Sequence, residues 1–399
     1  MAFFSFKPTA VFSAALLSIS FFFCSVQAAV LQVGSERKIK TIATAARQAI
    51  SGDIIEIDAG DYHGDVAVWS QERLDIRAVG GRARLFASGK SAEGKGIWVI
   101  RGGIVTVQGI EFHDASVPHN NGAGIRLEKG YLSVKNCLFK NNQTGILTGN
   151  NKETVLEVEN SEFGHNGDGT GQTHNLYAGT IARLSVRGSY SHHAKVGHLL
   201  KSRAALNVIA YNRLTDEAGG QASYELEFPA GGIAVVVGNI IEQSNTTQNS
   251  TIVSFGAEGF KHDDNALYLM FNTIMDDKHP NGMALQVKGG DNRRVVAYNN
   301  LLVSGERWNT VLPPGALTGG NFEACREDFV DAGNFDLRAS SAALLRTVAL
   351  PIPADLLLDQ VLRENNIFLS PSAEYDHPMK ARSLSAAPRR SGAIQTVKE

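Results

Sequence analysis

A short strand-like segment that ends in asparagine or glycine recurs along most of the chain. Successive repeats lie 24 to 33 residues apart, which suits one turn of a coiled chain. A unit of two or three short strands cannot bury its apolar side alone, whereas stacked copies form parallel sheets around one continuous core. The repeat therefore predicts an all-β fold, a right-handed parallel β-helix, with the end residues stacked in a side-chain ladder. These end residues are Gly109, Asn136, Asn160, Gly188, Asn212, Asn239, Asn272 and Asn299.

A second strand-like run lies between successive repeats. Examples are GIRLE from residue 124, GILTG from residue 145 and MALQV from residue 283. A leucine-rich repeat would need a shorter period and a fixed leucine pattern, which this sequence lacks. We therefore expect one domain over residues 29–399, with coils over about 54–310 and an irregular C-terminal tail over about 311–399.

The N-terminal region carries two further signals. Residues 1–28 combine a single lysine, an apolar run and small residues at Val26 and Ala28, which is the pattern of a secretory signal peptide. Residues 41–52 place apolar side chains on one helical face, between Thr41 as the candidate N-cap and Gly52 as the stop signal. We expect this amphipathic helix to cap the open end of the first coil.

Charge and composition limit the classes of partner that the protein can bind. The 38 Lys+Arg and 40 Asp+Glu leave a net charge of -2, which argues against a broad basic surface for nucleic acid. After the signal peptide, no apolar stretch is long enough to predict a membrane span. We expect a monomer that is periplasmic or secreted, without stable membrane insertion. Export permits a disulfide, but the sequence leaves open whether Cys137 and Cys325 pair.

The segment AISGDIIEIDAGDY at residues 49–62 is similar to the start of secreted β-helix proteins of the pectate lyase-like superfamily. The tail from residue 335 to residue 391 also resembles the irregular end segments of that group. The resemblance covers most of the mature chain and implies the β-helix fold. It leaves the activity open, because lyases, hydrolases, epimerases and non-catalytic adhesins share this scaffold.

Charged side chains concentrate on two neighbouring coils. In GHLLKSR, strand alternation places Lys201 and Arg203 on one face and His198 on the other. In SYELEF of the next coil, Glu225 and Glu227 are expected to point outward. The four charges would then form an array about 4.8 Å apart between strands and about 7 Å apart along each strand. Such an array is either a ladder of salt bridges or part of a functional site.

The flanking coils add polar groups to this array. HNLY places Asn175 and Tyr177 on one face with His174 at the strand edge, and SFGAEG places Glu258 at a turn. Tyr224 belongs to the inward-facing set of its strand. This concentration, which the runs IRLE and ILTG do not share, favours a site over a solvated face. We assign substrate binding to Asn175, His198, Tyr224 and Glu258.

A uronic-acid polysaccharide lying across these coils could undergo β-elimination. In that reaction a cation neutralises the uronate carboxylate, a base removes the adjacent proton and an acid protonates the leaving oxygen. Lys201 is the candidate base and Arg203 the candidate carboxylate clamp, because a guanidinium fork fits that group. His174 or Tyr177 would serve as the acid or as an alternative base.

Two other functions stay open. Glycoside hydrolysis needs two carboxyl groups that flank a sugar, whereas Glu225 and Glu227 project from one strand in parallel. A non-catalytic β-helix that binds polysaccharide is the second alternative. A passive solenoid, however, would need no cluster of lysine, arginine, histidine and tyrosine on adjacent coils.

The KS of GHLLKSR and the ELE of SYELEF are similar to segments of β-helix lyases of the chondroitinase B and alginate lyase type. This resemblance implies a catalytic role for Lys201. It also implies a Ca²⁺ ion at Glu225 and Glu227, because oxygen ligands suit this hard cation. The chain departs from that pattern, because its cations precede the carboxylates and Arg203 lies on the same strand as Lys201. The resemblance therefore supports a role for Lys201 less directly, and one for Arg203 less still.

Overall fold

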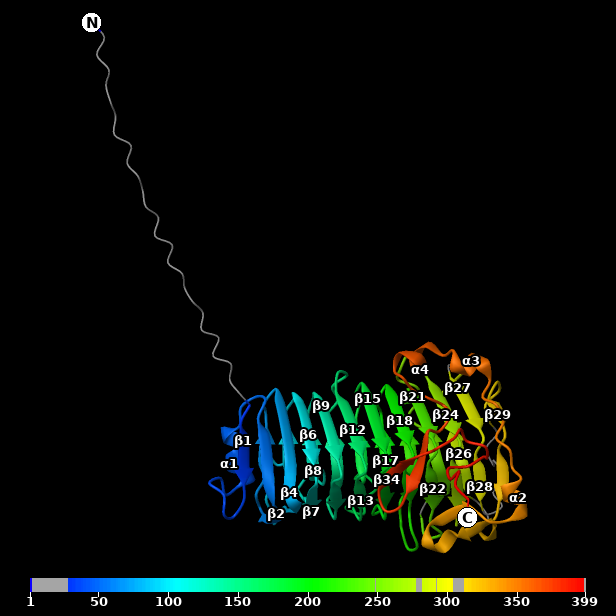
Figure 1. Cartoon of the computed structure of the whole chain (residues 1–399), viewed down its shortest axis with the longest axis horizontal. Helices are drawn as coiled ribbons and strands as arrows, with labels where there is room; N and C mark the ends of the chain where they lie inside the picture. The colour runs from blue at the N-terminus through cyan, green and yellow to red at the C-terminus, as the bar shows by residue number, and fades with distance from the viewer. Residues whose placement is uncertain (2–27, 248, 278–281, 292, 304–311, 398–399) are drawn as a thin grey trace.

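The computed structural model describes the whole chain apart from residues 2–27, 248, 278–281, 292, 304–311 and 398–399. The predicted signal peptide therefore lies almost entirely outside the described residues. The remaining chain winds around one long axis, so that successive turns lie side by side from β1 to β29 (Figure 1). Its strands pair in parallel with the equivalent strands of the coils before and after. The fold is thus a mostly β parallel β-solenoid, as the repeat predicted, and it has about ten turns.

One wall of the solenoid is a sheet of nine strands, one from each of nine coils. We call it the nine-stranded sheet. In spatial order its strands are β3 (Ala67–Trp69), β5 (Gly96–Ile100), β8 (Ala123–Leu127), β11 (Thr144–Thr148), β14 (Leu176–Ala178), β17 (His198–Ser202), β20 (Tyr224–Phe228), β23 (Thr251–Phe255) and β26 (Met283–Val287).

The other walls form one 21-stranded sheet made of two parallel ladders. The first ladder contains β1 (Val30–Val33), β2 (Ile54–His63), β4 (Arg73–Phe86), β6 (Ile104–Gln108), β9 (Tyr131–Lys135), β12 (Val155–Glu159), β15 (Arg183–Arg187), β18 (Leu206–Ala210), β21 (Ile233–Val237), β24 (Ala266–Met270), β27 (Arg294–Tyr298) and β29 (Leu317–Gly319). The second ladder continues from the ends of β2 and β4 through β7 (Ile110–His113), β10 (Leu138–Lys140), β13 (Glu162–Gly164), β16 (Tyr190–His192), β19 (Arg213–Thr215), β22 (Ile240–Gln243), β25 (Thr273–Asp276), β28 (Leu301–Val303) and β30 (Phe322–Ala324).

The parallel pairing is longer than the sequence indicated. It begins where β1 pairs with β2 and ends where β28 pairs with β30, beyond both predicted limits of the coils at about 54 and 310. The predicted helix exists as α1 (Ile42–Gln48), with Thr41 as its N-cap through a side-chain bond from the Thr44 N–H. Its buried residues Ile42 and Ala45 pack at the open end of the first coils, so the helix caps the core.

Inside the solenoid, equivalent side chains stack from coil to coil. The rings of Phe112, Phe139 and Phe163 lie parallel, with centroid distances of 5.0 and 4.8 Å. A second stack is polar: the Nδ2 group of Asn239 donates to the Oδ1 of Asn272 at 3.1 Å. Such stacks satisfy buried polar groups at each turn of the chain. The full polar stack contains Cys137, Ser161, Ser189, Asn212, Asn239, Asn272, Asn300 and Asn321.

This stack corrects the predicted ladder. Asn212, Asn239 and Asn272 do stack, whereas Asn160 and Gly188 sit one position earlier, at a turn with positive φ. The predicted set therefore mixed two adjacent positions. The turn position requires left-handed backbone, which glycine and asparagine tolerate, and the next position provides the stacked polar group.

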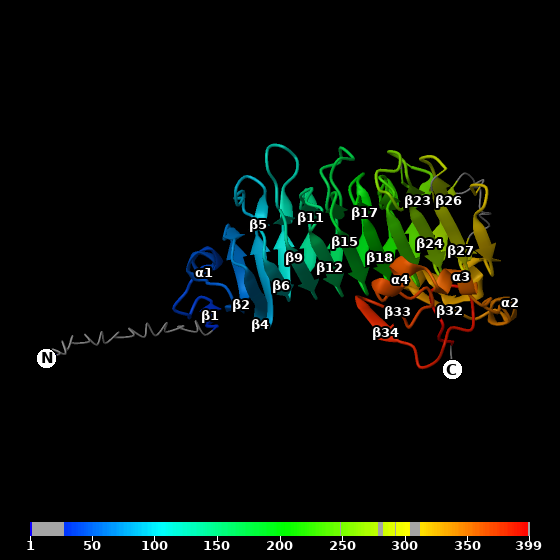
Figure 2. The ribbon, with the colours of Figure 1, turned by 90° about the horizontal axis from the view of Figure 1, so that it is seen from above.

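The C-terminal segment folds back along the outside of the last coils, where it is drawn in orange and red (Figures 1 and 2). Leu356 and Leu362 pack against Tyr268 and Met270 of β24, which covers the outer face of the first ladder. The segment contains η1 (Arg326–Asp328), β31 (Phe329–Asp331), η2 (Ala332–Asn334), β32 (Asp336–Ala339), α2 (Ala342–Leu345), α3 (Ala354–Leu357), α4 (Gln360–Glu364), β33 (Ala373–Asp376) and β34 (Lys380–Ser383).

Cys137 and Cys325 do not pair with each other: Cys137 is a free buried thiol and Cys325 a free exposed one. Among the described residues, no helix combines the length and the apolar character needed to cross a membrane.

Candidate functional site

The outer face of the nine-stranded sheet carries one continuous row of polar side chains. The register pairs Tyr177 of β14 with Lys201 of β17, Lys201 with Glu227 of β20, and Glu227 with Ser254 of β23. The row continues to Gln286 of β26. Parallel pairing without a bulge brings these residues to one line, because each coil repeats the path of the one before.

A carboxylate forms the centre of this row. Oε2 of Glu227 lies 3.2 Å from Nζ of Lys201 and 3.1 Å from Nδ1 of His198. Burial acts to raise the pKa of Glu227, but the adjacent His198 and Lys201 outweigh it, so this pKa is lowered. Burial lowers the pKa of His198, while Glu227 opposes that shift. Glu227 is therefore ionised and neutralises the lysine beside it.

Arg203 connects the row to an exposed acid. Its Nε donates to Oε2 of Glu258 at 2.9 Å, and its Nη1 donates to the hydroxyl of Tyr177. The guanidinium also lies over the Tyr177 ring, 5.2 Å from the centroid. Burial raises the pKa of Tyr177, and the nearby Arg203 offsets this only in part, so the phenol stays protonated at neutral pH.

Two histidines and a tyrosine form the buried edge of the site. The rings of His174 and His198 lie 4.4 Å apart, and Tyr224 meets His198 edge-on at 4.9 Å. The Nδ1 of His174 accepts the backbone N–H of His198 at 3.0 Å, which fixes the tautomer with its proton on Nε2. Burial lowers the pKa of His174 well below its ordinary value, so the ring is neutral.

The structure brings together all of the predicted site residues except Asn175 and Glu225. His198 was predicted on the face opposite Lys201, but its side chain reaches the same carboxylate as Lys201 does. His198 begins β17, and strict alternation does not apply to a residue that enters the strand from a turn. Tyr224 begins β20 and is half-buried beside His198, not inward as predicted.

The predicted outward direction of Asn175 and Glu225 is wrong. Asn175 is fully buried, accepts from Asn166 at 2.9 Å and donates to Ser191 at 3.0 Å. Glu225 is 0 % exposed and accepts a 3.5 Å hydrogen bond from Gln243. Asn175 lies directly before β14, and Glu225 is the second residue of β20, level with the buried Leu199 of β17. At this end of the two strands the side chains turn into the interior.

This burial bears on the predicted Ca²⁺ ligands Glu225 and Glu227. Burial, followed by the charge of Asp216, raises the pKa of Glu225 well above its ordinary value, which favours the protonated acid. Glu227 points outward and contacts two basic groups. The two carboxylates therefore do not fit one hard cation, which needs several ionised oxygens on one side.

Three residues near the site were not predicted from the sequence. Ser254 follows Glu227 in the row and is buried. Arg126 of β8 lies on the same row, separated from Tyr177 by Leu147 of β11. His262, in a segment that reads as a turn, places its Nε2 3.2 Å from the backbone oxygen of Arg203. Aligning the coil sequences on Lys201 would have found Ser254 and Arg126, because both occupy the same strand position.

The site thus offers two cations, a protonated phenol and two histidines on adjacent coils. Lys201 and Arg203 are half-buried, and Glu258 is exposed. Partial burial strengthens the attraction of such cations for an anionic ligand, because little water screens them. The arrangement suits a ligand that carries carboxylates and lies across the coils.

The fold and this row define a parallel β-solenoid with a polar site on one sheet. Among solved structures, pectate lyase Pel9A matches with a TM-score of 0.56 and 15% sequence identity, covering 93% of this chain and 97% of that one. A mutant of the PL6 family alginate lyase AlyGC matches with a TM-score of 0.38 and 16% identity, covering 75% of this chain and 40% of that one. No protein-family model and no curated protein match the chain. The likeness to Pel9A establishes the shared fold.

Proposed function

We propose that the chain is an exported lyase that cleaves a uronic-acid polysaccharide by β-elimination. The observation that carries the proposal is a connected group on one outer face: Tyr177, Lys201 and Glu227 on three adjacent strands, with Arg203 directly after the middle strand. A solenoid held together by its core and its polar stack has no structural need for this group. The fold shared with Pel9A supports the proposal at the level of scaffold only.

The proposed reaction assigns one task to each group. Arg203 binds the uronate carboxylate in a bidentate manner and stabilises the negative charge that develops there. Lys201, as a neutral amine, accepts the proton from the carbon next to the carboxylate. The electrons of that C–H bond form the new C=C bond, and the bond to the leaving glycosidic oxygen breaks. Tyr177 donates its phenolic proton to that oxygen.

The free site is not yet in this reactive state. Lys201 contacts ionised Glu227, and Arg203 contacts Glu258. Substrate binding must displace Glu258 from Arg203, and the Lys201 ammonium must first lose a proton to solvent before the neutral amine can accept the substrate proton. Glu227 lies 3.2 Å from the amine and therefore affects how readily Lys201 loses this proton. His198, which is buried and shares this carboxylate, is the alternative base.

The row also suggests how a polymer would lie. Arg126 of β8 and Lys201 of β17 occupy equivalent positions three strands apart, with Leu147 and Tyr177 between them, so basic groups recur along the solenoid axis. Strands lie about 4.8 Å apart, so a carboxylated chain running along the axis would meet Arg126 several coils away from Lys201. We propose that the partner is such a polysaccharide and that the predicted signal peptide directs the protein to the periplasm or beyond.

The test is incubation of the full chain with pectate, alginate and chondroitin, and with dextran as an uncharged control. Elimination produces an unsaturated uronate that absorbs in the ultraviolet, together with one new reducing end for each cleavage. Reducing ends without absorbance would replace the proposal with hydrolysis. Binding of an acidic polymer without any product would replace it with a carbohydrate-binding function. Equal results with dextran would refute the role of the cations.

A further inference from the structure

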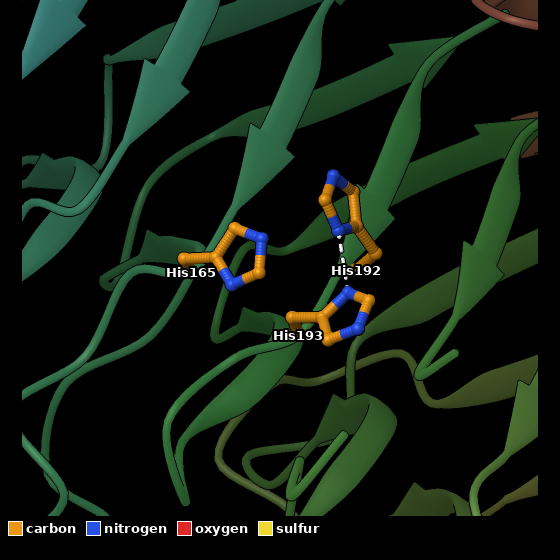
Figure 3. Close-up of side chains that lie close together, drawn as sticks. All are labelled: His165, His192 and His193. Carbon is orange, nitrogen blue, oxygen red and sulfur yellow. Dashed lines mark hydrogen bonds between the residues drawn. The ribbon is translucent and has the colours of Figure 1, made fainter. Parts of the chain in front are cut away.

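Three histidines converge on the edge of the solenoid, in a group that the proposed reaction does not use. His165 directly follows β13. His192 is the last residue of β16, and His193 directly follows it. The register pairs Gly164 with His192, so His165 and His193 occupy equivalent positions on adjacent coils. One ring nitrogen of each histidine lies within 4.8 Å of the others. Figure 3 shows the three rings facing a common space.

The contacts within the group are close. The Nδ1 atoms of His192 and His193 lie 2.7 Å apart, joined by a hydrogen bond (Figure 3). The rings of His165 and His193 stack at 4.7 Å, and His165 meets His192 edge-on at 5.3 Å. Since two unprotonated nitrogens repel at 2.7 Å, a proton must lie between them. A metal ion that binds both lone pairs would replace that proton.

The backbone permits these histidines but does not require them. His165 and His193 adopt left-handed φ values of 57° and 47°. The two preceding coils place Asp114 and Asn141 at the equivalent position, with φ of 64° and 59°. Aspartate, asparagine and histidine all tolerate this conformation. The fold therefore explains the conformation, but it does not explain two adjacent imidazoles with a third beside them.

The protonation state suits ligation. Burial and the neighbouring histidines lower the pKa of His165 to about 4, and burial also lowers the pKa of His193. Both rings are neutral at pH 7 and offer lone pairs, as a metal ligand must. Lys140 and Lys195 contribute to the shift of His165 and would repel a cation.

One carboxylate, that of Glu162, offsets that repulsion. Oε1 of Glu162 lies 3.3 Å from Nε2 of His192, on the side of the ring away from His193. The hydrogen bond with His192 lowers the pKa of Glu162, so this carboxylate is ionised. In metal sites, a carboxylate commonly contacts the ring nitrogen of a histidine ligand that does not bind the metal. This contact fixes the tautomer and makes the ring more basic.

We propose that His165, His192 and His193 bind one divalent transition-metal ion of the zinc type, with Glu162 positioning His192. Imidazole nitrogens suit Zn²⁺, Ni²⁺ and Cu²⁺, and three protein ligands leave a fourth position for solvent. Bonds of about 2.0–2.1 Å in tetrahedral geometry place ligand nitrogens about 3.3 Å apart. The two Nδ1 atoms must therefore separate by roughly half an ångström on binding, which a small rotation of the rings provides.

The first experiment titrates Zn²⁺ into the full chain after treatment with EDTA, by competition with a metal-binding dye. The expected result is one saturable equivalent in the wild-type protein. Binding should weaken at least tenfold in His165→Gln and in His193→Gln, and about 10- to 100-fold in Glu162→Gln. His119→Gln is the matched control, because His119 is exposed on a loop, and it should bind as the wild type does.

A second measurement uses the unaltered chain and so does not depend on the folding of the variants. Diethyl pyrocarbonate modifies accessible imidazole nitrogens, and peptide mass spectrometry locates each modified histidine. Zn²⁺ should protect His165 and His193 and leave His119 modified. The proposal fails if the wild type binds no equivalent of Zn²⁺, if the His193→Gln and wild-type affinities agree, or if Zn²⁺ protects His174 and His198 in place of the three histidines.

Discussion

The amine of Lys201 lies 3.2 Å from a carboxylate oxygen of Glu227 that is itself almost fully buried. The two residues are direct neighbours in the register of β17 and β20. An exposed lysine that pairs with an acid contributes little to stability. Here the carboxylate is shielded from water, so the lysine that neutralises it should matter for stability. Lys201 therefore has two roles that can be separated: it neutralises Glu227, and it is the proposed base.

Replacing Lys201 should separate these roles. We expect Lys201→Ala to lower turnover of the acidic polymer by about 10²- to 10⁴-fold, the usual contribution of a general base. The variant should also lose about 1–3 kcal/mol of unfolding free energy, because Glu227 keeps only His198 as a partner. The double variant Lys201→Ala with Glu227→Gln should recover the melting temperature but not the turnover.

The control for this series is Lys135→Ala. Lys135 forms a 3.3 Å ion pair with Glu159 on the exposed side of another wall of the solenoid, so neither activity nor melting temperature should change appreciably. Full activity in Lys201→Ala would remove Lys201 from the mechanism. Recovery of turnover in the double variant would show that only stability had been lost.

Glu258, a predicted substrate-binding residue, should instead compete with the substrate for Arg203. It is 46% exposed and holds Arg203 in the free protein, whereas the proposed reaction needs that guanidinium for the uronate. An exposed ion pair contributes about 0.2–1 kcal/mol, so Glu258→Gln should lower KM by a factor of about 1.5 to 5 and leave kcat unchanged. Arg203→Lys should raise KM, because lysine cannot form the bidentate contact. Glu153→Gln, on an exposed turn, is the control, and a raised KM in Glu258→Gln would contradict the competition.

The sequence predicted the fold well because a solenoid repeats one simple requirement. Each coil must place apolar side chains inward and a turn residue at its end, and this produces a visible period. The exact stack was harder to predict. In two coils the stacked residue is a serine, Ser161 or Ser189, and the residue before it is Asn160 or Gly188. One sequence alone does not reveal which of these two neighbouring residues is equivalent to Asn212.

The site was predictable where strand alternation holds. Lys201 and Glu227 lie inside their strands and point outward as alternation requires. Asn175 lies directly before β14 and Glu225 is only the second residue of β20, and at these positions the side chains turn inward against the direction that alternation predicted. The three-histidine group was not predicted, because it depends on the register of β13 and β16 and His165 lies far from His192 in sequence.

The buried Glu225 should make stability depend on pH. Its pKa is raised in the folded state, so its stabilising effect is fully present below about 4.5, the value in the unfolded chain, and is lost as pH rises from there. The neutral mimic Glu225→Gln avoids this loss. We expect Glu225→Gln to raise the melting temperature relative to wild type at pH 8 and to have little effect at pH 4. An equal change at both pH values would mean that the charge is not responsible, and Glu153→Gln should show no such difference.

The polar stack should be a main source of stability for the last coils. Asn272 donates to the Val236 carbonyl and to Asn300, and it accepts from both nitrogens of Asn239. Asn272→Ala would leave several buried groups without partners at about 1–3 kcal/mol each, so we expect a loss of at least about 3 kcal/mol in urea unfolding. Asn334→Ala removes one exposed bond to Asp331 and should cost less than about 1 kcal/mol. Similar losses in the two variants would show that coil-to-coil packing, not the asparagine stack, holds these turns together.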